Sequence, residues 1–176
     1  MKRALGLAMA LMLVGAGVVA ATTFPFPSQL AYHPRGNGWL VLTQLQSEDP
    51  RLVHSVGVAT DREGWHELWG RIAGLADLAP YVNFERQIVA VFVEGTNSCT
   101  TGVDFRNLVI DHADRLVYAV ISQTRGCMQL DVSGLVVFVV AIARDRLPAG
   151  RFILQLGPEP VCGSCADPSD RVIVDL

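Results

Sequence analysis

The chain has 176 residues, of which 51% are apolar and 18% are charged, and its formal net charge is −3. This composition is typical of a globular domain with a sizeable core, and it excludes a disordered chain. The negative balance gives no electrostatic support for binding the phosphate backbone of a nucleic acid.

The N-terminus has the three parts of a secretory signal. Lys2 and Arg3 are followed by an apolar run that ends in small residues at Ala20 and Ala21. This order predicts a signal peptide over 1–21, with cleavage after either alanine. The alternative is an uncleaved membrane anchor, because the run is near the lower limit for a membrane span. We therefore expect a secreted, periplasmic or cell-envelope protein, which contacts the membrane if the segment is retained.

Prolines and glycines mark the segment that follows the signal. Residues 22–38 contain Pro25, Pro27, Pro34, Gly36 and Gly38. Such a composition predicts an extended N-terminal linker or arm. The rest of the chain, 39–176, has the length of a single domain. Its first elements are expected to be short strands at 39–45 and 53–59, which are rich in apolar and β-branched residues.

The clearest local pattern starts at Thr60. Thr60 and Glu63 have the spacing of a capping box, which predicts that a helix begins there, and Gly74 is expected to end it. Apolar side chains recur at helical spacing on one face; they are Trp65, Leu68, Trp69 and Ile72. Because tryptophan is common at binding hot spots, Trp65 and Trp69 are candidates for a partner-binding ridge. The alternative is that this face packs on a sheet.

After the helix the pattern changes to that of strands. Apolar runs at 88–94, 116–121 and 134–143 predict strands buried on both faces, although the pattern alone does not exclude a buried helix. Residues 103–110 alternate and then shift phase near Asn107, which indicates a bulge or an edge position. Two further strands are expected at 151–156 and 171–176, and hairpin loops at 111–115 and 144–150. The predicted fold is α+β, with one main amphipathic helix and a largely antiparallel, curved sheet of six or more strands.

Four short motifs follow one another in the middle of the chain: WHELW, APYVNF, IVAVFVEG and CTTGVDF. Together they resemble the C-terminal domain family of PrcB, a subunit of a protease complex, over about 60–156. The matching positions are Trp65, Leu68 and Trp69 on the helix, Pro80 and Phe84 after it, and Gly95 and Gly102 at a strand end and a turn. The chain departs from the family at Asn83, where aspartate is frequent, and at Val103, where a second glycine is common. The resemblance implies an exported accessory module that associates with or stabilises a protease complex, and it carries over no catalytic residue.

The four cysteines are expected to be oxidised, because disulfides persist outside the cytosol. If the three strands after the helix form a meander, Cys99 and Cys127 leave the same end of the sheet, which favours a disulfide between them. Cys162 and Cys165 then form the second pair. Their spacing also fits a redox centre or half of a zinc site. We interpret this pair as a structural disulfide, because no helix follows to lower a thiol pKa and no second pair completes a zinc site.

No recognisable catalytic motif occurs in the sequence: neither a nucleophile elbow, nor HExxH, nor a phosphate-binding loop. The chain is therefore expected to be no enzyme, with no catalytic residue, metal or cofactor. Arg125, Arg144 and Arg146 are candidates for a basic rim that binds an anion, with ordinary exposed charge as the alternative. The first hypothesis is a secreted interaction module, an accessory subunit of an exported protease or of another envelope protein. The alternative is a small-ligand or metal binder that uses the cysteine loops and the Asp-His loop around His112.

Overall fold

The computed structural model describes residues 35–47, 52, 55–74, 79–96, 100–126, 134–157 and 170–176. They all belong to one compact unit, His33–Leu176. The predicted signal peptide, most of the predicted linker and all four cysteines lie outside the described residues. The expectations about export and disulfides therefore stay predictions.

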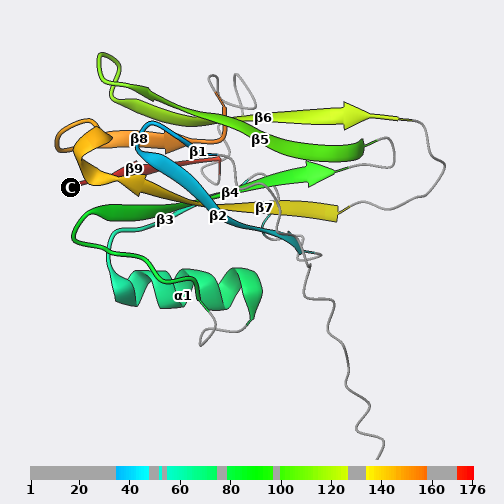
Figure 1. The fold of residues 1–176 in the computed structure, drawn as a ribbon, viewed down its shortest axis with the longest axis horizontal. Coiled ribbons are helices and arrows are strands. Elements are labelled where there is room, and N and C mark those ends of the chain that lie inside the picture. Colours follow the sequence, from blue (N-terminus) through cyan, green and yellow to red (C-terminus); the bar gives the residue numbers. More distant parts are fainter. Residues whose placement is uncertain are drawn as a thin grey trace, which may run out of the picture. The chain divides into compact units, whose positions relative to one another are not determined.

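Strands in two sheets make up most of the described chain, and one α-helix accompanies them (Figure 1). In chain order the elements are β1 (Arg35–Gly36), β2 (Trp39–Ser47), β3 (Val56–Ala59), α1 (Arg62–Ala73), β4 (Gln87–Thr96), β5 (Thr100–Asp111), β6 (Leu116–Arg125), β7 (Gly134–Ala143), the 3-10 helix η3 (Arg144–Arg146), β8 (Phe152–Gln155) and β9 (Arg171–Val174). Sheet A has the order β1-β2-β7-β4-β3, and sheet B has the order β5-β6-β8-β9. The pairings between these strands are antiparallel apart from that of β6 with β8, which is parallel. The predicted α+β class is confirmed.

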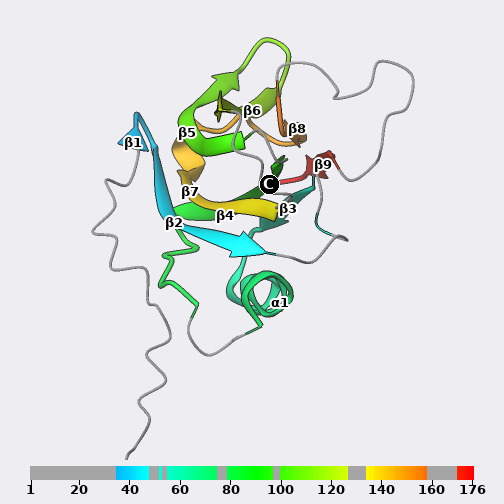
Figure 2. The same cartoon turned by 90° about the vertical axis from the view of Figure 1, so that its right-hand side faces the viewer.

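Sheet A is the middle layer of the fold, with α1 on one face and sheet B on the other (Figures 1 and 2). Successive side chains of β4 lie alternately on the two faces of sheet A. Ile88, Ala90 and Phe92 belong to the core between the sheets, whereas Val89 and Val91 belong to the core under α1. Such a strand needs apolar residues at consecutive positions, because neither face meets water. The prediction that the runs at 88–94 and 134–143 are buried on both faces is confirmed. For the run at 116–121 it is wrong, because β6 alternates: Val117 and Ala119 are buried, whereas Val120 is exposed.

The helix begins one residue later than the capping-box prediction. Asp61 is the N-cap, and its side chain accepts a hydrogen bond of 2.8 Å from the backbone N–H of Gly64. The expected pairing of Thr60 with Glu63 is therefore wrong: aspartate caps as well as threonine does, and the chain uses the second of two adjacent cap formers. The predicted end is confirmed, because Gly74 takes the left-handed conformation with φ of 67°.

The apolar face of α1 packs on sheet A. Trp65, Leu68, Trp69 and Ile72 are all buried. The indole N–H of Trp65 donates to the carbonyl of Pro80 at 3.0 Å, and the rings of Trp65 and Trp69 lie 5.2 Å apart. With 2% and 6% of their surfaces exposed, neither tryptophan offers a ridge to a partner in this structure. Their location corresponds to the core-packing alternative.

Sheet B corrects two expectations about connectivity. The predicted meander is wrong, since β4 lies in sheet A and β5 in sheet B. Of the three strands of the expected meander, only β5 and β6 pair with each other. The connection 144–150 is no hairpin loop either, because it leads from β7 in sheet A to β8 in sheet B. The expected phase shift near Asn107 is confirmed: the register of β5 against β6 shifts between Phe105 and Asn107, and β5 is an edge strand.

An aromatic cluster joins the two sheets. The ring of Phe105 on β5 lies 5.4 Å from that of Trp39, 6.0 Å from that of Phe92 and 5.5 Å from that of Phe138. The three partners come from β2, β4 and β7 of sheet A. Tilted rings at these distances are favourable beyond the area that they bury. The cluster therefore fixes how β5 sits over sheet A.

Candidate functional site: a slot beside strand β6

The candidate site lies where β8 stops following β6. The parallel pairing of the two strands covers Leu116 to Tyr118 of β6, whereas β6 itself continues to Arg125. Beyond Tyr118, no strand of the described chain pairs with this side of β6. On the other side β6 remains paired with β5 as far as Arg125. Among the described residues, one edge of β6 thus has no partner strand from Ala119 onward, and we call this stretch the open edge.

The backbone alternation of a strand determines which groups face the open edge. The carbonyl of Arg115 accepts a hydrogen bond from the backbone N–H of Ile153. At the start of β6, the backbone N–H and C=O groups of the odd-numbered residues therefore point toward β8. At the end of β6, the carbonyl of Thr124 accepts a hydrogen bond from the side-chain hydroxyl of Thr101 on β5. The backbone groups of the even-numbered residues therefore point toward β5. Since this alternation has a period of two, the N–H and C=O groups of Ile121 and Gln123 face the open edge.

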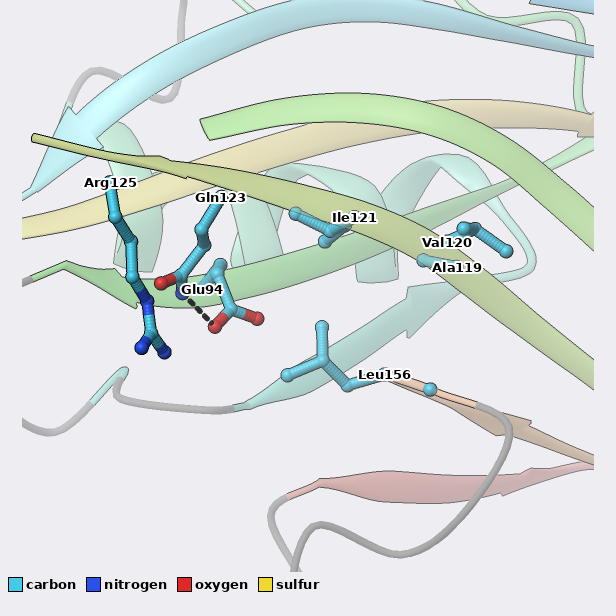
Figure 3. Close-up of a pocket in the computed structure, with 8 residues that line it drawn as sticks. Glu94, Ala119, Val120, Ile121, Gln123, Arg125 and Leu156 are labelled. Atoms are coloured by element: carbon cyan, nitrogen blue, oxygen red, sulfur yellow. Dashed lines mark hydrogen bonds between the residues drawn. The ribbon is translucent and has the colours of Figure 1, made fainter. Parts of the chain in front are cut away.

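A slot of about 470 Å³ runs along this edge (Figure 3). Its lining residues are Glu94, Ala119, Val120, Ile121, Gln123, Arg125, Leu156 and Gly157. One end is apolar, with Ala119, Ile121 and Leu156. The other end is polar, and there the side chains of Gln123 and Arg125 lie near Glu94 of β4 (Figure 3). The slot therefore offers two different environments in a row along one strand.

Gln123 connects the two sheets at the polar end. Its side-chain amide donates to Oε1 of Glu94 at 2.7 Å and to the carbonyl of Gly95 at 3.1 Å. Gln123 belongs to β6 in sheet B, whereas Glu94 and Gly95 belong to β4 in sheet A. This double hydrogen bond holds the floor of the slot in place, so the shape of the slot does not depend on a bound partner.

Of the three arginines of the expected basic rim, Arg144 and Arg146 both belong to η3, and Arg125 is not brought together with them. Arg125 ends β6 near Glu94, whose register partner on β7 is Val136. Arg144 follows the opposite end of β7, where Ala143 pairs with Gln87. Its guanidinium donates to the carbonyls of Phe84 at 3.0 Å and Thr60 at 2.5 Å. Arg144 is thus a tether for two loops, and the expectation of one anion-binding rim is wrong.

The Asp-His loop is a tight turn between β5 and β6. The carboxylate of Asp111 accepts hydrogen bonds from the backbone N–H groups of Ala113 at 2.9 Å and Asp114 at 3.1 Å. His112 is exposed in the same turn. Among the residues that the structure describes, no cluster of three or more histidine, cysteine or acidic side chains could hold a metal ion. Asp111 accounts for the turn, and nothing in its geometry favours a metal-binding role.

A second cleft, of about 610 Å³, lies at the Arg144 end of sheet A. Asn83, Glu85, Arg86 and Asp145 line part of it. Two of its polar groups already have structural roles: Arg144 is engaged as described, and Oδ1 of Asn83 accepts from the N–H of Glu85 at 3.1 Å. Since this cleft has no open strand edge, we take the slot beside β6 as the candidate site.

Comparison with protein-family models, with curated proteins and with solved structures finds no match for this chain. The resemblance to the PrcB C-terminal family consequently stays a prediction from the motifs. No helix of the described residues is long and apolar enough to span a membrane.

Sequence reasoning identified Arg125 but missed Glu94 and Gln123. A signal was present in β6. The inward positions change from Val117, Ala119 and Ile121, which contribute to the core, to Gln123 and Arg125. When the inward-facing residues of a strand change from apolar to polar partway along it, the polar part of the strand lies outside the hydrophobic core. This change marks the polar end of the slot.

Proposed function

We propose that the protein is an exported, non-catalytic interaction module that binds another protein at the slot beside β6. The accessory role in an exported protease complex, which the PrcB resemblance implies, is the setting that we propose for it. The observation that carries the proposal is the open edge of β6, with backbone hydrogen-bonding groups and a preformed slot next to each other.

An open strand edge is a favourable place for another chain to bind. An extended segment can pair with the exposed N–H and C=O groups, and pockets beside the edge then select its side chains. Proteins usually protect such edges with proline, lysine, bulges or a covering element. The stretch from Ala119 to Arg125 contains neither proline nor lysine, and the register shifts of the β5–β6 pair lie in β5. The edge therefore has the features of a docking strand.

Photo-crosslinking from two positions tests this function. A benzophenone amino acid at Val120, which lines the slot, is expected to capture a partner from the exported fraction in which the chain occurs. The same probe at Tyr81, which is 82% exposed and lines a different cleft, is the control. Capture at Val120 that excess unlabelled chain competes away supports the proposal. Equal capture at both positions, or none at Val120, contradicts it.

Intact mass spectrometry of the chain purified after expression in an exporting bacterium tests the proposed location. We expect loss of residues 1–20 or 1–21 and oxidation of all four cysteines, with each disulfide removing two hydrogen atoms from the mass. Peptide mapping without reduction is then expected to recover Cys99 joined to Cys127: although the three strands form no meander, Thr100 and Arg125, which are close to the two cysteines in sequence, are register partners. Recovery of the full-length chain with four alkylatable thiols would contradict export into an oxidising compartment.

A further inference from the structure

We infer that the partner segment is an extended acidic peptide that joins sheet B as a strand along the open edge of β6. It places an apolar side chain beside Ile121 and Leu156 and, four residues away, an acidic side chain beside Arg125. This inference rests on the proposed function and names the chemistry of its partner.

The backbone geometry explains why the ligand is extended. Successive odd-numbered residues of β6 present one N–H and one C=O each to the open edge, at the two-residue spacing of a strand. A partner that satisfies these groups has to repeat them at the same spacing, which another strand does and a helix does not. β8 already makes this kind of pairing with Leu116 to Tyr118, so the partner would take over where β8 ends.

The slot then fixes the pattern of side chains. In an added strand, every second side chain points toward sheet A, as on β6, where Ile121 packs against the core between the sheets and Gln123 reaches Glu94 (Figure 3). The position beside Ile121 meets Leu156 and therefore favours an apolar side chain. The position beside Gln123 meets a side-chain amide that is already bonded to Glu94, so a small polar side chain fits there. The next inward position lies beside Arg125.

Arg125 decides the charge of the ligand. It is exposed at the outer end of the slot, and it forms no ion pair with another residue of the described part of the chain. Glu94, the acid of the slot, keeps its charge when it accepts a hydrogen bond from Gln123, but it is half-buried, whereas Arg125 is the exposed charge that a ligand meets. A carboxylate beside Arg125 gains an opposite-charge pair across strands, whereas a lysine there meets a like charge.

A segment of the chain itself is the competing occupant. Residues 158–169 begin after Gly157, which lines the slot, and end before Asp170, whose carbonyl accepts from the N–H of Leu156. Three prolines, Pro158, Pro160 and Pro168, argue against this occupant, because proline cannot donate to a strand ladder. A peptide from another protein is therefore favoured over self-coverage.

Amide hydrogen exchange measured by NMR tests whether the edge is open. In the free protein, the amides of Ile121 and Gln123 are expected to exchange quickly, while those of Val120 and Ser122, which face β5, are protected and serve as internal controls. Protection of Ile121 and Gln123 in the free protein to the level of Val120 would overturn the inference, because the chain would then cover its own edge.

Titration with defined peptides tests the ligand chemistry. The probe is a labelled seven-residue peptide, Thr-Val-Thr-Gln-Thr-Glu-Thr, and its counterpart has lysine in place of the glutamate. We expect the acidic peptide to bind about fivefold more tightly than the lysine peptide, the scale of a cross-strand charge pair, and to protect the amides of Ile121 and Gln123. Arg125→Glu is expected to reverse this preference. Arg171→Glu, the same charge change at an exposed position of β9, is expected to leave it unchanged.

The two proposals fail differently. If Val120 captures a partner but neither peptide protects the edge, the acidic-strand chemistry is wrong and the interaction module stands. If the acidic peptide binds and Arg125→Glu does not reverse the preference, the placement of Arg125 is wrong. If no partner is captured at Val120, the proposed function is wrong, whatever the peptides do.

Discussion

Sheet A and sheet B differ in how much of their surface the rest of the molecule covers. Sheet A has α1 on one face and sheet B on the other, and consecutive residues of β4 and β7 are almost fully buried. In sheet B, Val120 and Ile173 remain 36% and 56% exposed, and β6 keeps an open edge. The comparison suggests a division between the two sheets: we expect sheet A to supply most of the stability, and sheet B carries the surface that we propose for binding.

The most severe test of this comparison removes an aromatic ring from sheet A. Phe138→Ala is expected to lower the free energy of unfolding by about 3–5 kcal/mol, because it leaves a cavity beside Phe105 in the aromatic cluster. Ile173→Ala, on the exposed face of sheet B, is expected to cost less than about 1 kcal/mol. Urea denaturation of the two variants measures both values. Similar losses would mean that the two sheets share the stability equally.

A smaller loss of stability is expected when Arg144, whose guanidinium binds two backbone carbonyls, is replaced. Arg144→Ala removes the hydrogen bonds that hold the carbonyls of Phe84 and Thr60, and charged hydrogen bonds of this kind contribute about 1.5–3 kcal/mol. We expect a loss of about 2 kcal/mol in urea denaturation, with peptide binding at the slot unchanged. Arg62→Ala, an exposed arginine on α1, is the control and should leave stability nearly unchanged. Weakened binding in Arg144→Ala would indicate that the two ends of sheet A are coupled.

The smallest effect distinguishes the two adjacent cap formers of α1. Asp61→Ala is expected to lower stability by about 1 kcal/mol, because the N–H of Gly64 loses its acceptor. Thr60→Ala keeps the backbone carbonyl that Arg144 uses and should cost less than half as much. Thermal unfolding followed by circular dichroism measures both. The reverse order would restore the capping box that the sequence predicts.

The features that the sequence predicted correctly are those with a strong local period. Apolar residues recur every three or four positions on the buried face of α1, and the strands that are buried on both faces have no polar residue at their centres. Both patterns can be recognised in the sequence without knowing the fold. The shift near Asn107 was also readable, because a bulge changes which residues of one strand point inward.

The assignment of strands to sheets could not be read in this way. Apolar and polar residues alternate along β5, and they would do so equally if β5 were paired with β4 in sheet A. The alternation therefore does not reveal that the chain crosses from sheet A to sheet B after β4. The slot has the same origin. It exists because β8 pairs with the first part of β6 and then departs, and a pairing between residues far apart in sequence leaves no local pattern beyond the polar change at Gln123.

The position of β7 in sheet A has a consequence for how the molecule acquires its structure. β7 begins at Gly134, yet it lies between β2 and β4 and pairs with both. A chain that emerges with its N-terminus first thus presents β2, β3 and β4 long before the strand that joins them is available. Contacts between residues so distant in sequence make folding slow. The middle layer therefore closes only after residue 143 has emerged, and until then β2 and β4 lack the strand that lies between them.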